Sequence, residues 1–319
     1  MTSESGGTLR EIGEFGLIER ITADGAAAVE TVLVGPGDDT ALLAAPDGRL
    51  LVTCDVLVEG VHFRRDWSTP VDVGRRAAAA SLADIAAMGG TATSLVVGFG
   101  APGDLPAAWA LACTAGLREE AGLVGAALVG GDVVESPTIV ISVTALGDLA
   151  GRPPVLRSGA TPGDRLAVAG RFGWAAAGLL MLSRGFKSPK VLVDAHRFPV
   201  PPYAAGPQAA IAGATSMIDV SDGLVADARH LAEASGVAVE IDTTEWEVPE
   251  PMQAAAAAYN MDPRTWMLDG GDDHALLATF PEGATVPEEF LVIGRVVAGE
   301  PEVRVDGAPR VGGGHRHFG

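Results

Sequence analysis

The chain has 319 residues, enough for two domains of ordinary size. Hydrophobic residues make up 48% and charged residues 20%, which is the range of globular proteins and excludes global disorder. Acidic residues number 41 and basic residues 22, a formal net charge of −19, so nucleic acid and anionic membrane are not expected partners, whereas a metal cation or a cationic substrate is.

The first half alternates helices and strands. Residues 8–20 predict an amphipathic helix capped by Thr8, with Glu11 at the capping-box spacing. Residues 38–45 and 49–60 predict two strands, and the turn residues between them predict a hairpin. There follow an Ala-rich helix over 72–88, a strand over 93–100, a helix over 105–121, a short strand over 126–129 that ends in Gly130-Gly131-Asp132, and a buried strand over 138–148.

A stretch of Gly, Pro and Arg between residues 151 and 162 marks the expected domain boundary, which divides the chain into residues 1–150 and 151–319. The second half is again mixed α/β, so the predicted fold class is α/β (α+β) with two domains. Its expected elements are strands over 165–170, 216–220, 237–241, 274–280, 290–296 and 302–305, helices over 174–183 and 222–235, and an Ala-rich helix near Met252.

Several kinds of site are excluded by what the sequence lacks. The only lysines are Lys187 and Lys190, and no Gly-Lys-Ser or Gly-Lys-Thr occurs, which rules out a Walker-type phosphate loop. Cys54 and Cys113 have neither zinc-site spacing nor a disulfide framework, so both are expected to be buried and the compartment to be the reducing cytoplasm. No signal peptide and no membrane-spanning helix is predicted.

Aspartates recur beside glycines where strands are expected to begin or end. These positions are Asp38, Asp39, Asp132, Asp219, Asp222, Asp272 and Asp273. Any one of them is explained by turn or cap chemistry, and for Asp222, which precedes a helix, an N-cap is the better interpretation from the residues alone.

Two other aspartates resist that explanation. Asp55 interrupts the apolar strand LLVTCDVLV, where an unpaired carboxylate is costly. Asp84 falls in the last turn of a helix, the wrong end for the helix dipole. Because basic residues are few, a hard cation is the expected partner, and without an EF-hand spacing Mg²⁺ is favoured. With a helix N-terminus after Ser221-Asp222 suited to an anion, the residues indicate a Mg-phosphate enzyme.

Seven motifs then occur in an order that matches one family: GPGDDTALL, TCDVLVEGVHF, SLADIAAMGG, GGDVVES, LRSGATPGD, MIDVSDGL and GGDDHALLATF. In this combination the sequence resembles thiamine-monophosphate kinases from about Gly13 to the end of the chain. That family is grouped with aminoimidazole ribonucleotide synthetase, selenophosphate synthetase and a hydrogenase-maturation protein. The resemblance implies an N-terminal domain that binds ATP and Mg²⁺ and forms a homodimer through its sheet, and a C-terminal α+β domain that completes the nucleotide and substrate site.

The resemblance also implies roles for individual residues. Those expected to bind Mg²⁺ are Asp39, Thr53, Cys54, Asp55, Asp84, Asp132, Asp219 and Asp222. Those expected to contact ATP are Gly131, Asp132, Arg157 and Ser221, and those expected to contact thiamine phosphate are His62 and Asp272. From the residues alone, His62 is better explained as a core histidine, and Arg157 equally well as a surface arginine.

The sequence departs from the family pattern at three places. Cys54 stands where the family has threonine, and because a thiol is a poor Mg²⁺ ligand only its backbone carbonyl is expected to serve. Asp272 replaces a substrate-contacting glutamate that is one methylene longer. The tail segment Val311-Gly312-Gly313-Gly314-His315 lacks the family's substrate-stacking aromatic residue, so that contact is not expected here.

The expected reaction is transfer of a phosphoryl group from ATP to thiamine phosphate, giving thiamine diphosphate. Because the acceptor is itself a phosphate with a second pKa of about 6, no general base is expected, and direct in-line transfer is favoured over a phospho-enzyme. Two alternatives stay open: another ATP-using enzyme of the same superfamily, and a degenerate, non-catalytic Mg-nucleotide-binding protein.

Overall fold

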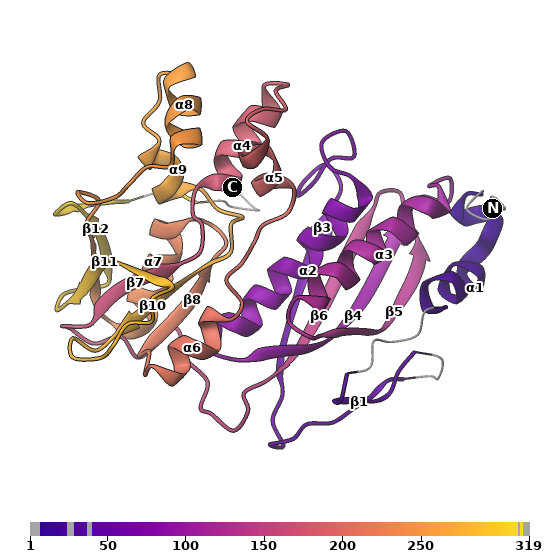
Figure 1. Ribbon diagram of the computed structural model, residues 1–319, viewed down its shortest axis with the longest axis horizontal. Coiled ribbons are helices and arrows are strands. Elements are labelled where there is room, and N and C mark those ends of the chain that lie inside the picture. Colours follow the sequence, from indigo (N-terminus) through magenta and orange to yellow (C-terminus); the bar gives the residue numbers. More distant parts are fainter. Residues whose placement is uncertain (1–6, 24–28, 37–39, 312, 315–319) are drawn as a thin grey trace. The chain divides into compact units, whose positions relative to one another are not determined.

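A computed structural model describes residues 7–23, 29–36, 40–311 and 313–314. The chain divides into two compact units, shown in Figure 1. Unit 1 holds Met1–Ile85 and Thr91–Gly151, and unit 2 holds Ala86–Gly90 and Arg152–Gly319. Both units combine helices with mixed β-sheets, so the predicted α/β (α+β) class is confirmed.

Unit 1 is built on a four-stranded sheet in the order β3-β6-β4-β5, formed by β3 (Leu51–Val58), β6 (Val140–Asp148), β4 (Thr91–Ala101) and β5 (Ala127–Glu135). The β3–β6 and β6–β4 pairs are antiparallel and β4–β5 is parallel. The parallel pair is joined through α3 (Ala107–Gly122), the long crossover that such a pair requires.

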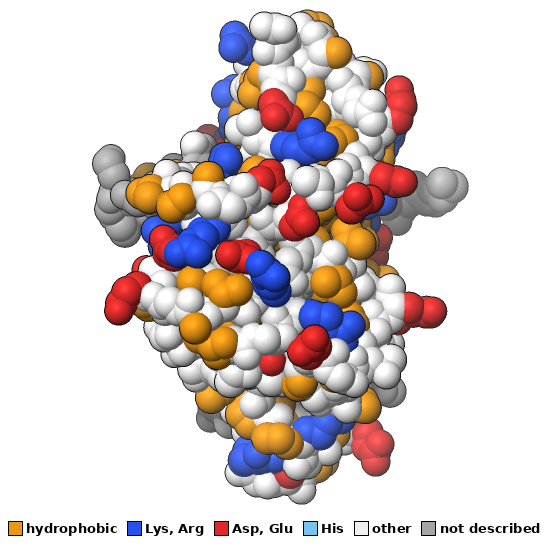
Figure 2. Space-filling view, turned by 90° about the vertical axis from the view of Figure 1, so that its left-hand side faces the viewer, with side chains coloured by type: hydrophobic (Ala, Val, Ile, Leu, Met, Phe, Trp, Pro, Cys, Tyr) orange, Lys and Arg blue, Asp and Glu red, His pale blue; other side chains and the backbone are white. Residues whose placement is uncertain are grey.

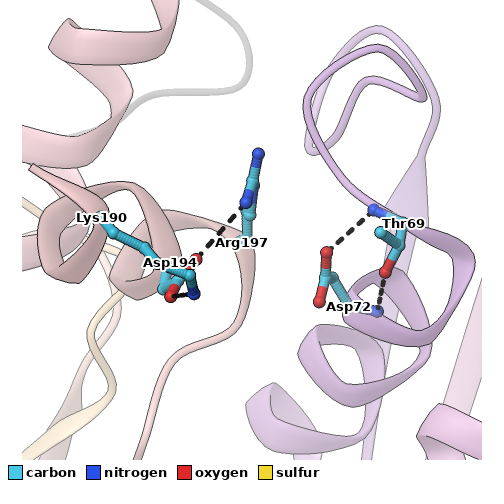
Figure 3. A network of polar contacts seen from close by, with 5 residues as sticks. All are labelled: Thr69, Asp72, Lys190, Asp194 and Arg197. Atoms are coloured by element: carbon cyan, nitrogen blue, oxygen red, sulfur yellow. Dashed lines mark hydrogen bonds and ion pairs between the residues drawn. The ribbon is translucent and has the colours of Figure 1, made fainter. Parts of the chain in front are cut away.

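The helices α2 (Pro70–Ala87) and α3 lie on one face of this sheet (Figure 1). They approach each other closely because glycines remove the side chains between them. A Cβ on Gly116 would lie 2.1 Å from the Val71 carbonyl oxygen, and one on Gly74 would lie 1.9 Å from the Cys113 carbonyl oxygen. The start of α2 carries a reciprocal capping box, in which the Thr69 N–H donates to Asp72 (2.8 Å) and the Asp72 N–H donates to the Thr69 hydroxyl (3.2 Å; Figure 3).

The opposite face of the four-stranded sheet exposes apolar side chains. Alternate positions of β3 point there, and Val52 and Val56 are 62% and 47% exposed; Val96 of β4 and Val134 of β5 are exposed as well. Cys54 belongs to the same set and is exposed, so the prediction that both cysteines are buried is wrong for Cys54. The period-2 alternation of a strand, which a mixed apolar run conceals, decides which side Cys54 faces.

The N-terminal segment folds differently from the prediction in one respect. Helix α1 (Leu9–Thr22) begins with the predicted capping box between Thr8 and Glu11, and it kinks at Gly13. The predicted hairpin between residues 38–45 and 49–60 is wrong, because β2 (Leu42–Leu43) pairs with β1 (Val32–Val34) in a small sheet of its own while β3 pairs with β6.

Unit 2 contains a seven-stranded sheet in the order β13-β12-β9-β11-β7-β10-β8. Its strands are β7 (Arg165–Ala169), β8 (Ser216–Val220), β9 (Ala238–Ile241), β10 (Ala275–Phe280), β11 (Phe290–Val297), β12 (Glu302–Val305) and β13 (Ala308–Pro309). Every residue of β8 and β10 is buried, which is the pattern of strands covered on both faces. One hydrophobic core cluster packs the strands β8, β10 and β11 against α6. Its side chains include Met217, Phe280, Phe290 and Ala209.

The helices of unit 2 are α4 (Trp174–Ser183), α5 (Lys190–Arg197), α6 (Ala205–Ile211), α7 (Leu224–Ser235), α8 (Glu250–Ala258) and α9 (Arg264–Asp269). The sequence did not predict α5, α6 or α9, which are short. On α5, Asp194 accepts hydrogen bonds from Lys190 and Arg197, one turn before it and one turn after it (Figure 3). Such pairs support a short helix that has little intrinsic stability.

Acidic and basic side chains lie interspersed on the face seen in Figure 2, despite the strongly negative net charge. Ion pairs also join neighbouring strands of unit 2, such as Arg295 of β11 with Glu240 of β9 at 2.7 Å. Within the described residues, no helix is both long enough and apolar enough to cross a membrane.

Candidate active site

Two groups of carboxylates stand out, one in each unit. The first lies between β3 and α2 and is called here the seam cluster: Thr53, Asp55, Ser81 and Asp84. The Thr53 hydroxyl donates to Asp84 Oδ2 (2.5 Å) and the Ser81 hydroxyl donates to Asp55 Oδ2 (2.7 Å). Thr53 and Asp55 are two residues apart on β3, and Ser81 and Asp84 are three apart on α2, so each pair shares a face of its element. The structure therefore brings together Thr53, Asp55 and Asp84, which the sequence predicted as metal ligands.

Cys54 lies between two members of the seam cluster but points the other way. Its thiol contacts the Ser142 hydroxyl at 3.3 Å on the uncovered face of the sheet. The side chain is thus separated from Asp55 by the thickness of the strand, which agrees with the expectation that only the backbone of Cys54 is available to a cation near Asp55.

His62 lies in the turn that follows β3. Its Nδ1 accepts a hydrogen bond from the Val58 N–H at 3.0 Å, which fixes the ring relative to the end of the strand. The side chain is half-buried. Because Nδ1 is an acceptor, the neutral ring carries its proton on Nε2.

Asp132 and the diglycine before it lie inside β5, and the prediction that they form a turn after a short strand is wrong. A Cβ on Gly131 would lie 2.2 Å from the Val97 carbonyl oxygen, so the close β4–β5 pairing requires glycine there. Asp132 is exposed, and its Oδ1 accepts from the Val133 N–H at 2.9 Å.

Asp132 is not near the seam cluster within one chain. In the sheet register Asp55 pairs with Val143, Val143 with Val97, and Val97 with Gly131, which places β5 three strands away from β3. At roughly 4.8 Å per strand the separation is about 14 Å. Asp132 pairs with Gly98 and therefore lies on the opposite, uncovered face of the sheet.

A cavity of about 820 Å³ opens beside Asp132, within unit 1. Apolar side chains of α1, β4 and α3 line much of it, including Phe15, Ile18, Val96 and Leu117, and Gly130-Gly131-Asp132 form another part of the wall. Cys113 also lines it, and burial raises the pKa of its thiol to about 12, so the thiol stays protonated at neutral pH. Arg118 is the basic residue among the lining side chains, and it donates to the Ile21 carbonyl at 2.5 Å.

The second group, called here the two-turn cluster, is formed in unit 2 by the turns Ser221–Gly223 and Gly270–Asp273 together with Asp219, Asp227 and His274. Asp219 is buried near the end of β8, and its Oδ2 lies 3.1 Å from His274 Nδ1. The two turns lie against each other, because the Asp272 N–H donates to the Ser221 carbonyl (2.8 Å) and a Cβ on Gly271 would lie 2.2 Å from that same oxygen. Ser221, Asp222 and Asp272 are thus brought together as predicted site residues.

Asp227 belongs to this cluster and was missed by the sequence analysis. Its Oδ2 accepts hydrogen bonds from the N–H groups of Asp222 (3.0 Å) and Gly223 (3.1 Å), so it holds the turn ahead of α7. The prediction that Asp222 caps this helix is therefore wrong: the cap position is Gly223, and Asp227 supplies the acceptor. The available signal was an acidic residue in the first turn of a helix that follows a glycine turn.

The pKa of the Asp227 carboxyl lies above its ordinary value. Burial and the nearby charges of Asp219 and Asp222 raise its pKa to about 7, against the two N–H donors, which lower it. Carboxylate oxygens of Asp222 and Asp227 and a ring nitrogen of His230 lie within 4.8 Å of one another. His230 is exposed, as expected for a surface residue, but it adjoins the site.

Asp273, in the Gly270–Asp273 turn, binds the start of helix α4. Its Oδ1 accepts from the Ala175 N–H at the start of α4 (3.0 Å), while its buried Oδ2 has no hydrogen-bond partner among the described residues. Burial raises the pKa of this carboxyl to about 7. Asp272 has a φ of +69°, a left-handed conformation that Asp and Asn tolerate better than longer side chains.

Two predicted residues are not part of either cluster as described. Arg157 is exposed in unit 2, and its backbone carbonyl accepts from the Ser235 hydroxyl at 3.1 Å, at the end of α7 away from the Ser221–Gly223 turn. Asp39 lies outside the described residues.

Comparison with known proteins identifies the family. Residues 37–149 match the family model of AIR synthase related protein, N-terminal domain. The chain is 51% identical over 314 residues to the thiamine-monophosphate kinase of Mycobacterium tuberculosis, covering 98% of this chain and 93% of that one. It is 38% identical over 300 residues to the thiamine-monophosphate kinase of Corynebacterium glutamicum, covering 91% and 88%. The chain belongs to the thiamine-monophosphate kinase family.

Solved structures extend the likeness to the whole fold. The structure of Aquifex aeolicus thiamine monophosphate kinase superposes with a TM-score of 0.77 at 32% identity, covering 95% of this chain and 99% of that one. AaThiL complexed with AMPPCP and TMP gives a TM-score of 0.81 at 34% identity, covering 98% and 99%. A hydrogenase-maturation protein, HypE, has the same fold at 17% identity with a TM-score of 0.68, covering 86% of this chain and 87% of that one. The resemblance noted in the motifs is thereby confirmed.

Proposed function

We propose that this chain catalyses the reaction that names its family, transfer of the terminal phosphoryl group of ATP to the phosphate of thiamine monophosphate. The observation that carries the proposal is the pair of preorganised carboxylate groups, the seam cluster and the two-turn cluster, at positions where the family resemblance expects metal ligands. The joint binding of AMPPCP and TMP by AaThiL, a relative that matches nearly the whole chain, supports it.

Both clusters offer donors that suit Mg²⁺. Each contains hard carboxylate oxygens and hydroxyl groups, and neither contains a thiol ligand. One feature fits a cation: burial and the nearby charges of Asp219 and Asp222 raise the pKa of Asp227, so positive charge is favourable there. When bound, Mg²⁺ supplies the positive charge that lets two polyanionic phosphates approach. We assign Mg²⁺ binding in unit 1 to Asp55 and Asp84, with Thr53 and the Cys54 carbonyl beside them, and in unit 2 to Asp219 and Asp222.

We infer direct transfer rather than a phospho-enzyme, because the acceptor is itself a phosphate that can attack ATP without a protein nucleophile. The Cys113 thiol is held protonated by burial, and the Cys54 thiol faces away from Asp55. The acceptor phosphate, with a second pKa of about 6, is already nucleophilic at pH 7. The site residues therefore position and neutralise rather than abstract a proton.

Substrate contacts are assigned to His62 and Asp272, as the family resemblance expects. The Val58 N–H donates to His62 Nδ1 and orients the ring, and Nε2 is the atom assigned to the thiamine phosphate. Asp272 stands at the end of the diglycine turn and provides a carboxylate of the sign that suits the thiazolium cation. Contacts to ATP are assigned, from the family resemblance, to Gly131 and Asp132 beside the cavity of unit 1 and to Arg157 and Ser221 of unit 2.

The active form is proposed to be a homodimer that uses the uncovered sheet face of unit 1. The exposed apolar residues Val52, Val56, Val96 and Val134 lie on that face, which a partner would shield from water. Asp132 lies on the same face, about 14 Å from Asp55 within one chain.

The dimer proposal is tested with a charged substitution in the centre of the face. Val56→Glu should shift the particle measured by light scattering from a dimer to the 32.4 kDa monomer and lower turnover with it. Val61→Glu, at an exposed valine just after β3, is the matched control and should stay dimeric. A wild-type particle of 32.4 kDa at micromolar concentration would refute the dimer.

The catalytic proposal is tested by following ADP and thiamine diphosphate formation together. Turnover should require both Mg²⁺ and thiamine monophosphate, and free thiamine should not replace it because it lacks the acceptor phosphate. ADP release that is as fast with free thiamine, or in EDTA, as with thiamine monophosphate and Mg²⁺ would contradict the proposal. Binding of Mg-nucleotide without any turnover would favour the degenerate, non-catalytic alternative. The division of labour between residues 1–150 and 151–319 and the cytoplasmic location stay predictions.

A further inference from the structure

One arginine near the end of the chain connects the elements that carry the two-turn cluster. Arg310 follows β13, and its guanidinium makes a fork with Asp269, through Nε to Oδ1 (3.3 Å) and Nη2 to Oδ2 (2.5 Å). Its N–H donates to the Val303 carbonyl at 2.9 Å, and its own carbonyl accepts from Arg229 Nη2 at 2.6 Å. Arg310 therefore touches β12, α7 and α9 at once.

Asp269, the partner of this fork, is the last residue of α9 and directly precedes the diglycine turn. Its carbonyl oxygen lies 2.6 Å from the place where a Cβ on Gly223 would be, so its backbone is pressed against the Ser221–Gly223 turn. Two residues further on, Gly271 and Asp272 contact Ser221 as described above. A shift of Asp269 would thus be passed to both turns within three residues.

Arg229 completes the connection on the other side. It belongs to α7, the helix that begins at Leu224 directly after the Ser221–Gly223 turn. By binding the Arg310 carbonyl it ties the start of the C-terminal tail to that helix. The tail continues against the same elements, since a Cβ on Gly313 would lie 2.3 Å from Asp269 Oδ1 and one on Gly314 would lie 2.7 Å from the Ala226 Cβ.

We propose that Arg310 is a positioning residue: its fork with Asp269 and its link to Arg229 fix the spacing between the Ser221–Gly223 and Gly270–Asp273 turns. A forked arginine–carboxylate pair suits this task because two parallel hydrogen bonds fix orientation as well as distance. Arg310 does not itself contact the carboxylates of the cluster. The effect on catalysis rests on the proposed function, whereas the effect on the turns does not.

The experiment compares Arg310→Gln with Arg295→Gln. Arg295 pairs with Glu240 between β11 and β9 of the same unit, through Nε and Nη2 to one carboxylate oxygen, so it is the control. Arg310→Gln should raise the KM for thiamine monophosphate and the Mg²⁺ concentration for half-maximal activity by about 10-fold, as loss of an outer partner of a metal site does. Arg295→Gln should change neither, and Arg310→Lys should recover part of the loss.

A second measurement is independent of turnover. Amide hydrogen exchange followed by mass spectrometry should speed up in peptides that cover residues 219–224 and 269–274 in Arg310→Gln, and not in Arg295→Gln. Asp269→Asn should reproduce both effects, and the double variant should be no worse than either single one, because the two residues act as a unit.

The outcomes separate the two proposals. If the wild type turns over no thiamine monophosphate, the proposed function fails, while faster exchange in Arg310→Gln still supports the positioning role. A lower melting temperature with unchanged KM, Mg²⁺ requirement and exchange in the two turns would overturn it and show that Arg310 is only structural. If Arg310→Gln does not fold, Arg310→Lys and Asp269→Asn are judged by the same readouts.

Discussion

The seam cluster and the two-turn cluster hold carboxylates by different means. In the seam, Asp55 and Asp84 lie on a strand and a helix and receive side-chain hydroxyls from Ser81 and Thr53. In the turns, Asp227 is buried and receives two backbone N–H groups, and Asp219 adjoins a histidine ring. The seam is therefore specified by side chains at strand and helix spacing, whereas the turns are specified by the path of the backbone.

The difference has consequences for substitution. A side chain in the seam can be replaced by a neutral one of the same shape without disturbing the strand or the helix, so its chemical role is separable from the fold. A change in the turns alters backbone positions that several ligands share. Substitutions in the seam should therefore reduce activity without loss of stability, and substitutions in the turns should change both.

The largest effect is expected in the seam. Asp55→Asn should lower kcat by about 10³-fold or more, because it removes a charge that holds the metal ions, and should leave the melting temperature nearly unchanged. Asp66→Asn, at an exposed acidic residue of the same unit, is the control and should keep full activity. Near-normal turnover of Asp55→Asn in a folded protein would show that this carboxylate is structural and remove the contrast between the clusters.

A backbone change tests the other side of the comparison. Gly271→Ala would bring a Cβ to 2.2 Å from the Ser221 carbonyl, which forces the two turns apart. Activity should fall by about 100-fold, and the free energy of unfolding should fall by about 1–3 kcal/mol in parallel. Gly283→Ala, where no atom lies within 4 Å of the added Cβ, is the matched control. A Gly271→Ala protein with normal activity would mean that the turn spacing does not matter.

The raised pKa values of Asp273 and Asp227 predict that stability depends on pH. A carboxyl whose pKa rises on folding, here from 3.8 to about 7 for Asp273, binds its proton more tightly in the folded state. Stability is then fully present below about pH 4 and is lost as the pH rises towards 7, by up to about 1.4 kcal/mol per pH unit. Asp227 adds a contribution of the same sign.

Chemical denaturation in EDTA between pH 5 and pH 7.5 measures this dependence. Asp273→Asn should show a flatter slope than the wild type, whatever its absolute stability, because the side chain no longer titrates. Identical slopes for Asp273→Asn and wild type would contradict the raised pKa of Asp273.

The smallest effect is expected at Asp272. Asp272→Glu adds one methylene and should bring the carboxylate closer to thiamine monophosphate, lowering its KM several-fold, or by about 1 kcal/mol, with no change in the KM for ATP. Because φ is +69° there, glutamate should also cost roughly 0.5 kcal/mol of stability. A higher KM in the variant would indicate that the turn already places the shorter side chain correctly.

Much of the architecture could be predicted from local patterns. The strand over 216–220, the helix over 174–183 and the Thr8–Glu11 capping box occur as expected, because apolar periodicity and cap residues act over a few positions. The prediction of a hairpin before β3 was wrong, because a turn sequence favours reversal of the chain but does not determine which strand pairs with which. In the folded sheet β3 pairs with β6, more than eighty residues away.

The sequence by itself determined the family and the candidate carboxylates, since motif order and the misfit of Asp55 in an apolar strand are visible without coordinates. Only the tertiary structure decided which of them meet. Sheet register placed Asp132 three strands from Asp55 and on the other face, and the contact between two turns some fifty residues apart brought Asp272 to Ser221. Burial within the whole unit, which no short segment encodes, raised the pKa of Asp227 and Asp273. The fold also placed Asp227 as the acceptor that holds the turn before α7.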